Sequence, residues 1–188
     1  MTCRPLPLLL LPLLLAACGS GAVVGSAKIG VVTPAAAVPG ASRDAGDQTQ
    51  SAAEAQLLRE LNAARAVGRT CGGQFMPAVS AVTWNGYLAR SARAYAQDMA
   101  NRGFFAHVDP DGRTHSQRDE AAGYSGWTTV GENIIGGYSL GETTAAWLES
   151  TDHCMAIMSP AYKEVGVAFL QEAGHAFSTY GVQEFGTR

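Results

Sequence analysis

The chain has 188 residues, and its 13 Lys and Arg side chains against 16 Asp and Glu give a formal net charge of −3. No cluster of basic residues offers the positive stripe that phosphate binding requires, so we expect no nucleic-acid partner. The sequence also lacks the HExxH motif of zinc proteases and the glycine-rich loops that hold nucleotide phosphates. These observations exclude the commonest nucleotide-binding and nucleic-acid-binding classes.

The first residues predict an export signal that ends at a lipidation site. Positions 5–15 form a run of leucine and proline of the length expected for a secretory signal, too short to span a bilayer. The run ends in Leu15-Ala16-Ala17-Cys18, which is similar to the bacterial lipobox, where the cysteine thiol receives a diacylglyceryl group. We predict a signal peptide over 1–17 and membrane attachment through lipid on Cys18. The alternative is an ordinary cleavage site with an incidental cysteine.

The predicted location is the bacterial cell envelope. Gly19-Ser20 lacks the aspartate that retains bacterial lipoproteins at the inner membrane, which indicates the outer membrane where the source has one. Positions 18–50 consist largely of small residues without helical or strand periodicity, and they predict a flexible linker after the lipidated residue. The remaining 51–188 is long enough for one hydrophobic core and short for two.

Two cysteines remain for the folded domain, because Cys3 would leave with the signal and Cys18 would carry lipid. In an oxidising compartment, we predict that Cys71 and Cys154 form a disulfide bond. Two buried thiols are one alternative. A Cys/His metal site is another, since His153 adjoins Cys154.

Local patterns predict several helices. Ser51-Ala-Ala-Glu54 has the pattern of a capping box and predicts a helix start, and Ser139 with Glu142 repeats this pattern before a helix that runs through Trp147 to Ser150. A helix from Trp84 to near Gly103 carries apolar residues at helical spacing. A shorter helix is expected around 116–122.

The C-terminal third predicts strands. Positions 164–170 and 176–185 are expected to pair as a hairpin through 172–175, and 130–135 supplies a third strand. Helices therefore precede a small antiparallel sheet. This order predicts the α+β class, with helices packed on both faces of the sheet.

One catalytic motif is present without its usual context. Gly137-Tyr-Ser-Leu-Gly141 matches the GxSxG nucleophile elbow, but that fold places several strands before the serine, and the upstream residues here are mainly helical. The capping box already gives Ser139 a structural role. We therefore do not assign a serine hydrolase.

A set of short motifs extends from about Leu57 to Gly186, and no single motif is specific. The set comprises Leu61-Asn62, Arg65, Trp84-Asn85, the helix to Met99, Phe105 to His107, Asp109-Pro-Asp-Gly112, Arg118, Gly123-Tyr124, Gly131-Glu132-Asn133, Trp147, His153, Met158-Ser-Pro160, Tyr162, Val165-Gly166 and Gln183 to Gly186. In this order and spacing, the chain resembles bacterial members of the CAP superfamily (cysteine-rich secretory proteins, antigen 5, pathogenesis-related 1). The resemblance implies an α-β-α sandwich for 51–188. It also implies a cavity lined by two histidines and two acids, which in some members holds a divalent metal.

Carried over to this sequence, the resemblance places His107, His153 and Glu132 in that cavity, while Ser150 stands where the second acid is expected. Zinc normally takes three protein ligands and an open position, or four ligands, so His107, His153 and Glu132 only just suffice for a metal such as zinc. Ser150 would instead orient the imidazole of His153 if one helix carried both. His115 and His175 match no motif of the family, and we expect both to face solvent.

These residues favour a binding or interaction module at the envelope over an enzyme. The candidate partners are a small ligand, a lipid, an envelope protein or a divalent metal in the cavity. The alternative is metal-assisted, peptidase-like hydrolysis with Glu132 as the general base. Binding is favoured because no activated nucleophile is recognisable and the fourth polar group of the cavity is missing.

Overall fold

The structure, a computed structural model, describes residues 46–188. The predicted signal, Cys18 and most of the linker lie outside the described residues. The elements, in chain order, are α1 (Ala52–Arg65), β1 (Arg69–Cys71), β2 (Gln74–Met76), β3 (Thr83–Trp84), α2 (Gly86–Arg102), α3 (His115–Ala121), β4 (Thr129–Gly136), α4 (Leu140–Glu149), α5 (Thr151–Ile157), β5 (Glu164–Gln171) and β6 (Thr179–Thr187).

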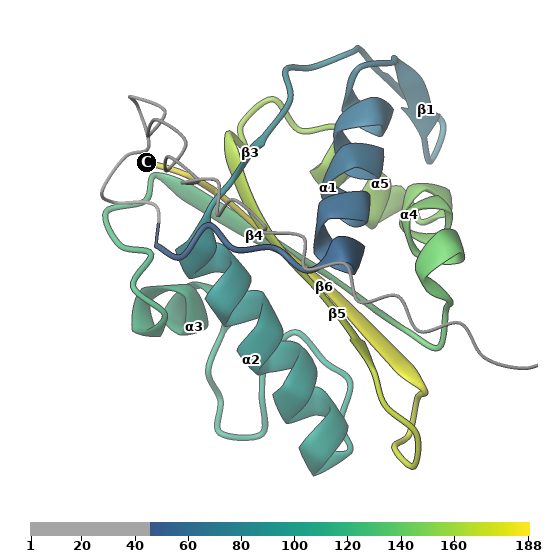
Figure 1. Cartoon of the computed structure of the whole chain (residues 1–188). Helices are drawn as coiled ribbons and strands as arrows, with labels where there is room; N and C mark the ends of the chain where they lie inside the picture. Colours follow the sequence, from purple (N-terminus) through teal and green to yellow (C-terminus); the bar gives the residue numbers. More distant parts are fainter. Residues whose placement is uncertain (1–45) are drawn as a thin grey trace, which may run out of the picture. The chain divides into compact units, whose positions relative to one another are not determined.

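A four-stranded sheet in the order β3-β5-β6-β4 forms the middle layer. The pairs β5–β6 and β4–β6 are antiparallel, and the short strand β3 runs parallel to β5. Figure 1 shows α2 across one face of this sheet, and α1, α4 and α5 on the other. The predicted α+β class and the placement of helices on both faces are confirmed.

Helix boundaries follow the predicted capping signals, with one exception. Ser51 N–H donates to Glu54 Oε2 at 2.7 Å, and Gly103 ends α2 with a left-handed φ of 66°. Trp84, predicted to be helical, lies in β3 instead, because the side chain of Asn85 accepts a hydrogen bond from the N–H of Tyr87 and caps α2 there. The hairpin β1–β2 and the strand β3 had no recognised sequence signal.

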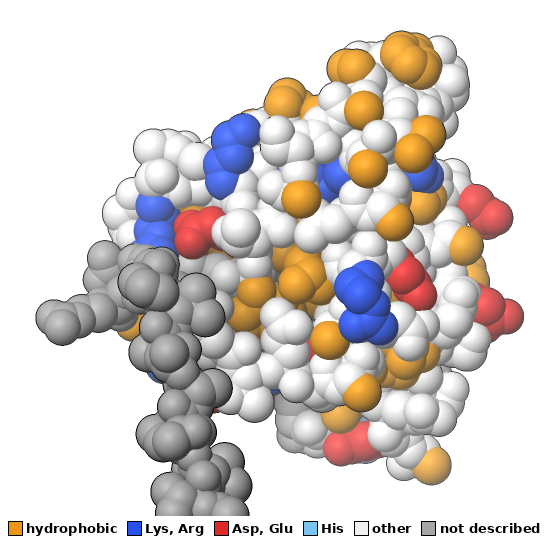
Figure 2. Space-filling view, turned by 45° about the horizontal axis from the view of Figure 1, so that its top comes forward, with side chains coloured by type: hydrophobic (Ala, Val, Ile, Leu, Met, Phe, Trp, Pro, Cys, Tyr) orange, Lys and Arg blue, Asp and Glu red, His pale blue; other side chains and the backbone are white. Residues whose placement is uncertain are grey.

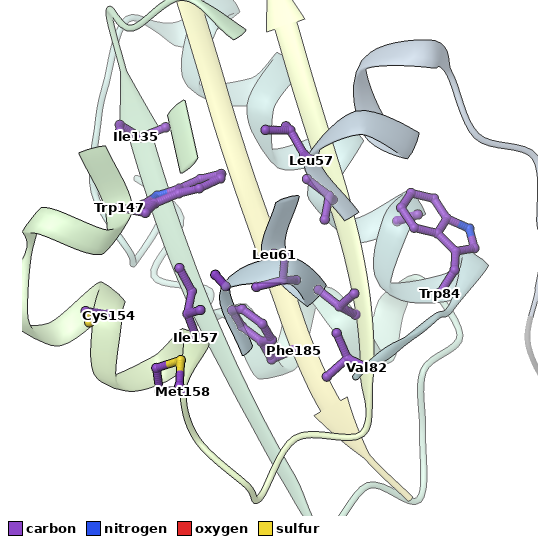
Figure 3. Close-up of a cluster of buried hydrophobic side chains, with 14 of the residues drawn as sticks. Leu57, Leu61, Val82, Trp84, Ile135, Trp147, Cys154, Ile157, Met158 and Phe185 are labelled. Carbon is purple, nitrogen blue, oxygen red and sulfur yellow. The ribbon is translucent and has the colours of Figure 1, made fainter. Parts of the chain in front are cut away.

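The main hydrophobic core fills the space between the sheet and the helices α1, α4 and α5. Figure 3 shows Leu57 and Leu61 of α1 together with Trp147 of α4 and Phe185 of β6, and all four side chains are fully buried. A Cβ atom at Gly181 would lie 2.8 Å from the Ile135 side chain and 3.3 Å from the Trp147 ring, so this glycine makes room for both side chains. A second apolar cluster packs α2 against the opposite face of the sheet.

A buried arginine ties α1 to the connecting segments around it. Arg65 is 1% exposed, and its guanidinium donates to the carbonyls of Ser80 at 2.9 Å, Ile157 at 2.5 Å and Ser159 at 3.0 Å. These bonds join α1 to the segment before β3 and to the end of α5. The charge is thus compensated by backbone dipoles.

One face of the described region carries hydrophobic, acidic and basic side chains in alternation, without one dominant kind (Figure 2). On the face drawn in Figure 2, hydrophobic side chains lie between separate acidic and basic groups. Within residues 46–188, none of the helices combines the length and the hydrophobicity required to cross a bilayer.

The predicted disulfide bond is confirmed. Cys71 of β1 and Cys154 of α5 are bonded, their Cα atoms lie 5.6 Å apart, and both residues are 1% exposed. The bond fixes the small hairpin β1–β2 to α5, so it connects segments that are 83 residues apart in the sequence.

Reduction of this disulfide is expected to lower the melting temperature of the protein. Opening the loop restores chain entropy to the unfolded state, which corresponds to about 4 kcal/mol in the chain-entropy model. Thermal unfolding followed by circular dichroism, with and without a phosphine reductant, measures the change. The control is the Cys71→Ala/Cys154→Ala variant, whose melting temperature should not respond to the reductant. Two free thiols in the exported protein, found by mass spectrometry, would contradict the bond.

Candidate functional site

The centre of the site is an imidazole held by a buried carboxylate. His107 lies in the loop after α2, and its Nδ1 is 2.7 Å from Oε1 of Glu132 on β4. The side chain of His107 is 55% exposed, whereas that of Glu132 is 1% exposed. The hydrogen bond that Glu132 accepts from the imidazole raises the pKa of His107 above its ordinary 6.5, although burial and the charge of Arg118 oppose this shift. The site therefore presents a readily protonated imidazole to solvent.

Arg118 of α3 engages the other oxygen of Glu132. Its guanidinium donates to Oε2 at 2.6 Å, and also to the carbonyls of His107 at 3.2 Å and Arg113 at 2.9 Å. The same guanidinium lies over the ring of Tyr95 on α2, 3.3 Å from the ring centroid. Four parts of the chain, α2, the loop after it, α3 and β4, therefore meet at one cation.

The second predicted histidine, His153, lies on a helix, whereas His107 lies in a loop. His153 of α5 is half buried, and its pKa is lowered by burial and by the charge of His107. The suggestion that Ser150 and His153 share one continuous helix is wrong. Ser150 has an extended backbone, with φ −80° and ψ 130°, and it separates α4 from α5.

For the three residues predicted to ligate a metal, the arrangement of Glu132 is unfavourable, because its oxygens already have other partners. Within residues 46–188, the potential metal-binding group of three consists of other residues than His107, Glu132 and His153. Hydrogen bonds from His107 and Arg118 already occupy both oxygens of Glu132. Ser150 supplies no carboxylate. Glu132 instead serves to hold the imidazole of His107 in place.

The structure places three other titratable residues together, and the sequence analysis missed this group. His115 and Asp119 are one turn apart on α3, and with Glu184 of β6 they form a group whose ligand atoms all lie within 4.8 Å of one another. Asp119 and Glu184 are fully buried. The expectation that His115 faces solvent is wrong, because it is half buried and its Nδ1 is covered.

Burial and neighbouring acids shift the pKa of both carboxyl groups upward. Burial raises the pKa of Asp119 to about 7, and the charge of Glu132 adds to this while Ser91 and Arg118 oppose it. Burial also raises the pKa of Glu184 well above its ordinary value, with Asp119 and Glu132 adding to the shift. Glu184 stands directly opposite Glu132 in the pairing of β4 with β6.

A cleft opens between α2 and α3, and none of His115, Asp119 and Glu184 lines it. Its volume is about 340 Å³. The lining residues are Arg90, Ser91, Ala94, Tyr95, Asp98, Arg113, Arg118, Ala121 and Ala122. Two of them, Tyr95 and Arg118, also belong to the network around Glu132.

The described residues form a three-layer α-β-α fold in which His107, Glu132 and Arg118 are linked at one face. The sequence model of the cysteine-rich secretory protein family, CAP, matches residues 58–185, and the chain belongs to this family. Over 85 residues it is 33% identical to the protein YkwD of Bacillus subtilis (strain 168). That match covers 45% of this chain and 33% of YkwD, so the chain spans about a third of the length of that relative.

Solved structures support the same fold. An outer surface protein of Borrelia burgdorferi superposes with a TM-score of 0.62 at 20% identity, over 76% of this chain and 98% of its own. An extracellular protein from Bacillus anthracis str. Ames that contains an SCP domain gives a TM-score of 0.51 at 21% identity, over 58% of this chain and 35% of its own.

Removal of the charge on Glu132 is expected to lower the pKa of His107. The hydrogen bond with Glu132 is the main cause of the raised value, so the Glu132→Gln variant should titrate closer to 6.5. Nuclear magnetic resonance of the imidazole protons measures this shift. Because the folded-state pKa of His107 is raised, its contribution to stability is complete below the unfolded-state pKa and is lost as the pH rises through the folded-state pKa.

The control is Glu142→Gln, which removes a carboxylate from the capping box of α4 and leaves His107 untouched. An unchanged pKa of His107 in Glu132→Gln would contradict the assigned role of Glu132.

Proposed function

We propose that this chain is an exported, lipid-anchored binding module of the CAP family, and that His107 recognises a small amphipathic ligand with an anionic group. The observation that carries the proposal is an exposed imidazole fixed by a buried carboxylate, which itself is held by Arg118. The carboxylate of Glu132 favours the protonated form of the His107 imidazole. A preformed cation at the surface is suited to binding an anion.

The residues beside His107 suggest the apolar half of the ligand. Phe105 and Val108 are 41% and 49% exposed, which is high for large hydrophobic side chains. Phe105 also packs edge-on against Phe177, with ring centroids 5.2 Å apart, so its ring has a fixed orientation. A ligand that combines an alkyl or aryl part with a carboxylate or phosphate matches this surface.

Hydrolysis is less well supported than binding. A general base needs an oxygen that can accept a proton from an attacking water, but Glu132 is buried and both of its oxygens are hydrogen-bonded. Ser139, in the GxSxG motif, donates to its capping partner Glu142 at 2.5 Å. Neither residue has the geometry of an activated catalytic group.

Export is supported by three independent features. The predicted signal precedes the domain, the disulfide Cys71–Cys154 is typical of oxidising compartments, and two structural relatives carry the descriptions outer surface protein and extracellular protein. Anchoring through Cys18 would hold the binding domain near the membrane.

The ligand proposal is tested with laurate, which has a carboxylate and an alkyl chain. Calorimetric titration of the EDTA-treated protein should detect binding, and His107→Ala should weaken it by about tenfold, as expected for loss of one charge-assisted hydrogen bond. His175→Ala is the matched control, because that histidine pairs with Glu172 on the β5–β6 hairpin. Equal laurate affinity in wild type and His107→Ala, or no binding at all, would reject the proposal.

The anchor is tested by metabolic labelling with an alkyne fatty acid. The wild-type protein should carry the label and partition with membranes, whereas Cys18→Ser should be unlabelled. Cys3→Ser is the control, since Cys3 lies in the predicted signal and its replacement should leave labelling intact. Label on the Cys18→Ser protein, or a mature N-terminus other than Cys18, would show that the anchor is assigned wrongly.

A further inference from the structure

We propose that His115, Asp119 and Glu184 form a buried binding site for a divalent transition metal such as zinc or manganese. The site lies between α3 and β6 and does not use His107 or His153. It therefore goes beyond the proposed function, and the two can fail separately.

The geometry brings one imidazole and two carboxylates to the same point. Their ligand atoms all lie within 4.8 Å of one another, and atoms that bind one zinc ion are separated by about 3–4 Å, as follows from metal–ligand distances of about 2.1 Å. Small side-chain adjustments are enough to close that difference. His115 and Asp119 are held on one face of α3 by their spacing of four residues, and Glu184 projects from β6.

Most of the polar side-chain atoms of this group lack a well-formed hydrogen bond in the described structure, although Ser91 lies close to Asp119 and Glu132 lies close to Glu184. Within residues 46–188, both oxygens of Asp119, both oxygens of Glu184 and Nδ1 of His115 are buried and form no hydrogen bond of acceptable geometry. Native proteins rarely leave five buried polar atoms unsatisfied. A bound cation would satisfy the carboxylates and the imidazole together.

The charge balance also favours a dication. Asp119 and Glu184 carry two negative charges when ionised, and neither forms a salt bridge within residues 46–188. The nearby cation Arg118 is engaged with Glu132 at 2.6 Å. A divalent ion supplies the matching positive charge, and buried carboxylates are normally paired or bind metal.

One residue that lines the cleft between α2 and α3 is a neighbour of the proposed ligand Asp119. Ser91 lines this cleft, and its hydroxyl lies close enough to Asp119 to affect the pKa of that carboxyl, although no well-formed hydrogen bond joins them.

One imidazole and two carboxylates together favour a transition metal over calcium or magnesium. Calcium and magnesium prefer oxygen ligands alone, whereas an imidazole with carboxylates suits zinc and manganese. We therefore expect zinc to bind far more tightly than calcium.

The test is calorimetric titration of the purified, EDTA-treated protein with zinc, manganese and calcium. We expect one zinc per chain, and an affinity about 100-fold lower in His115→Ala and in Asp119→Asn, because each substitution removes a ligand. Zinc should raise the melting temperature of the wild type and not of these variants. The control, His107→Ala/His153→Ala, removes the histidines of the other site and should bind zinc as the wild type does.

Several results would overturn the proposal: no zinc binding by the wild type, unchanged affinity in both ligand variants, or loss of binding only in the His107→Ala/His153→Ala control. Circular dichroism checks that each variant is folded. If Asp119→Asn is misfolded, His115→Ala decides, because His115 is only half buried in the first turn of α3. Laurate binding is measured in EDTA, so its outcome is independent of this site.

Discussion

The ion pair between Arg118 and Glu132 is the interaction on which the functional face depends. Both side chains are almost fully buried, and a buried ion pair is favourable only when further hydrogen bonds satisfy both partners. The two terminal nitrogens of Arg118 meet this condition by also donating to the carbonyls of His107 and Arg113, and the guanidinium stacks on Tyr95, while its Nε is buried without a hydrogen-bond partner in the described structure. Loss of either partner would leave an uncompensated charge inside the domain and would release the loop that carries His107.

Elements with local signals could be predicted from the sequence. The capping residues Ser51 and Ser139 and the terminal glycine Gly103 fix helix ends through hydrogen bonds within a few positions, so their patterns are sufficient. Strand β3 has no such signal. Thr83 pairs with Glu164, 81 positions later (164 − 83), and only the folded sheet makes that segment a strand.

The site was predicted in part, and the missing part has a physical reason. Family motifs identify His107, Glu132 and His153, but they do not show that Arg118 occupies one oxygen of Glu132. His115 and Asp119 were not recognised as a pair, because the predicted helix began at 116, one residue after His115. Glu184 was the harder residue, because an acid in a strand is ordinarily expected to face solvent.

Strand alternation explains how Glu184 is buried. Tyr180 and Val182 of β6 pack against α2, and Glu184 continues that same face, whereas Phe185 points into the core with Leu57 and Leu61. A shift of one residue in the register of β6 would exchange these faces, placing the carboxylate in the apolar core. The pairing of β6 with β4 on one side and β5 on the other prevents this shift. The register that completes the hydrophobic core is therefore also what places Glu184 opposite Glu132 and beside Asp119.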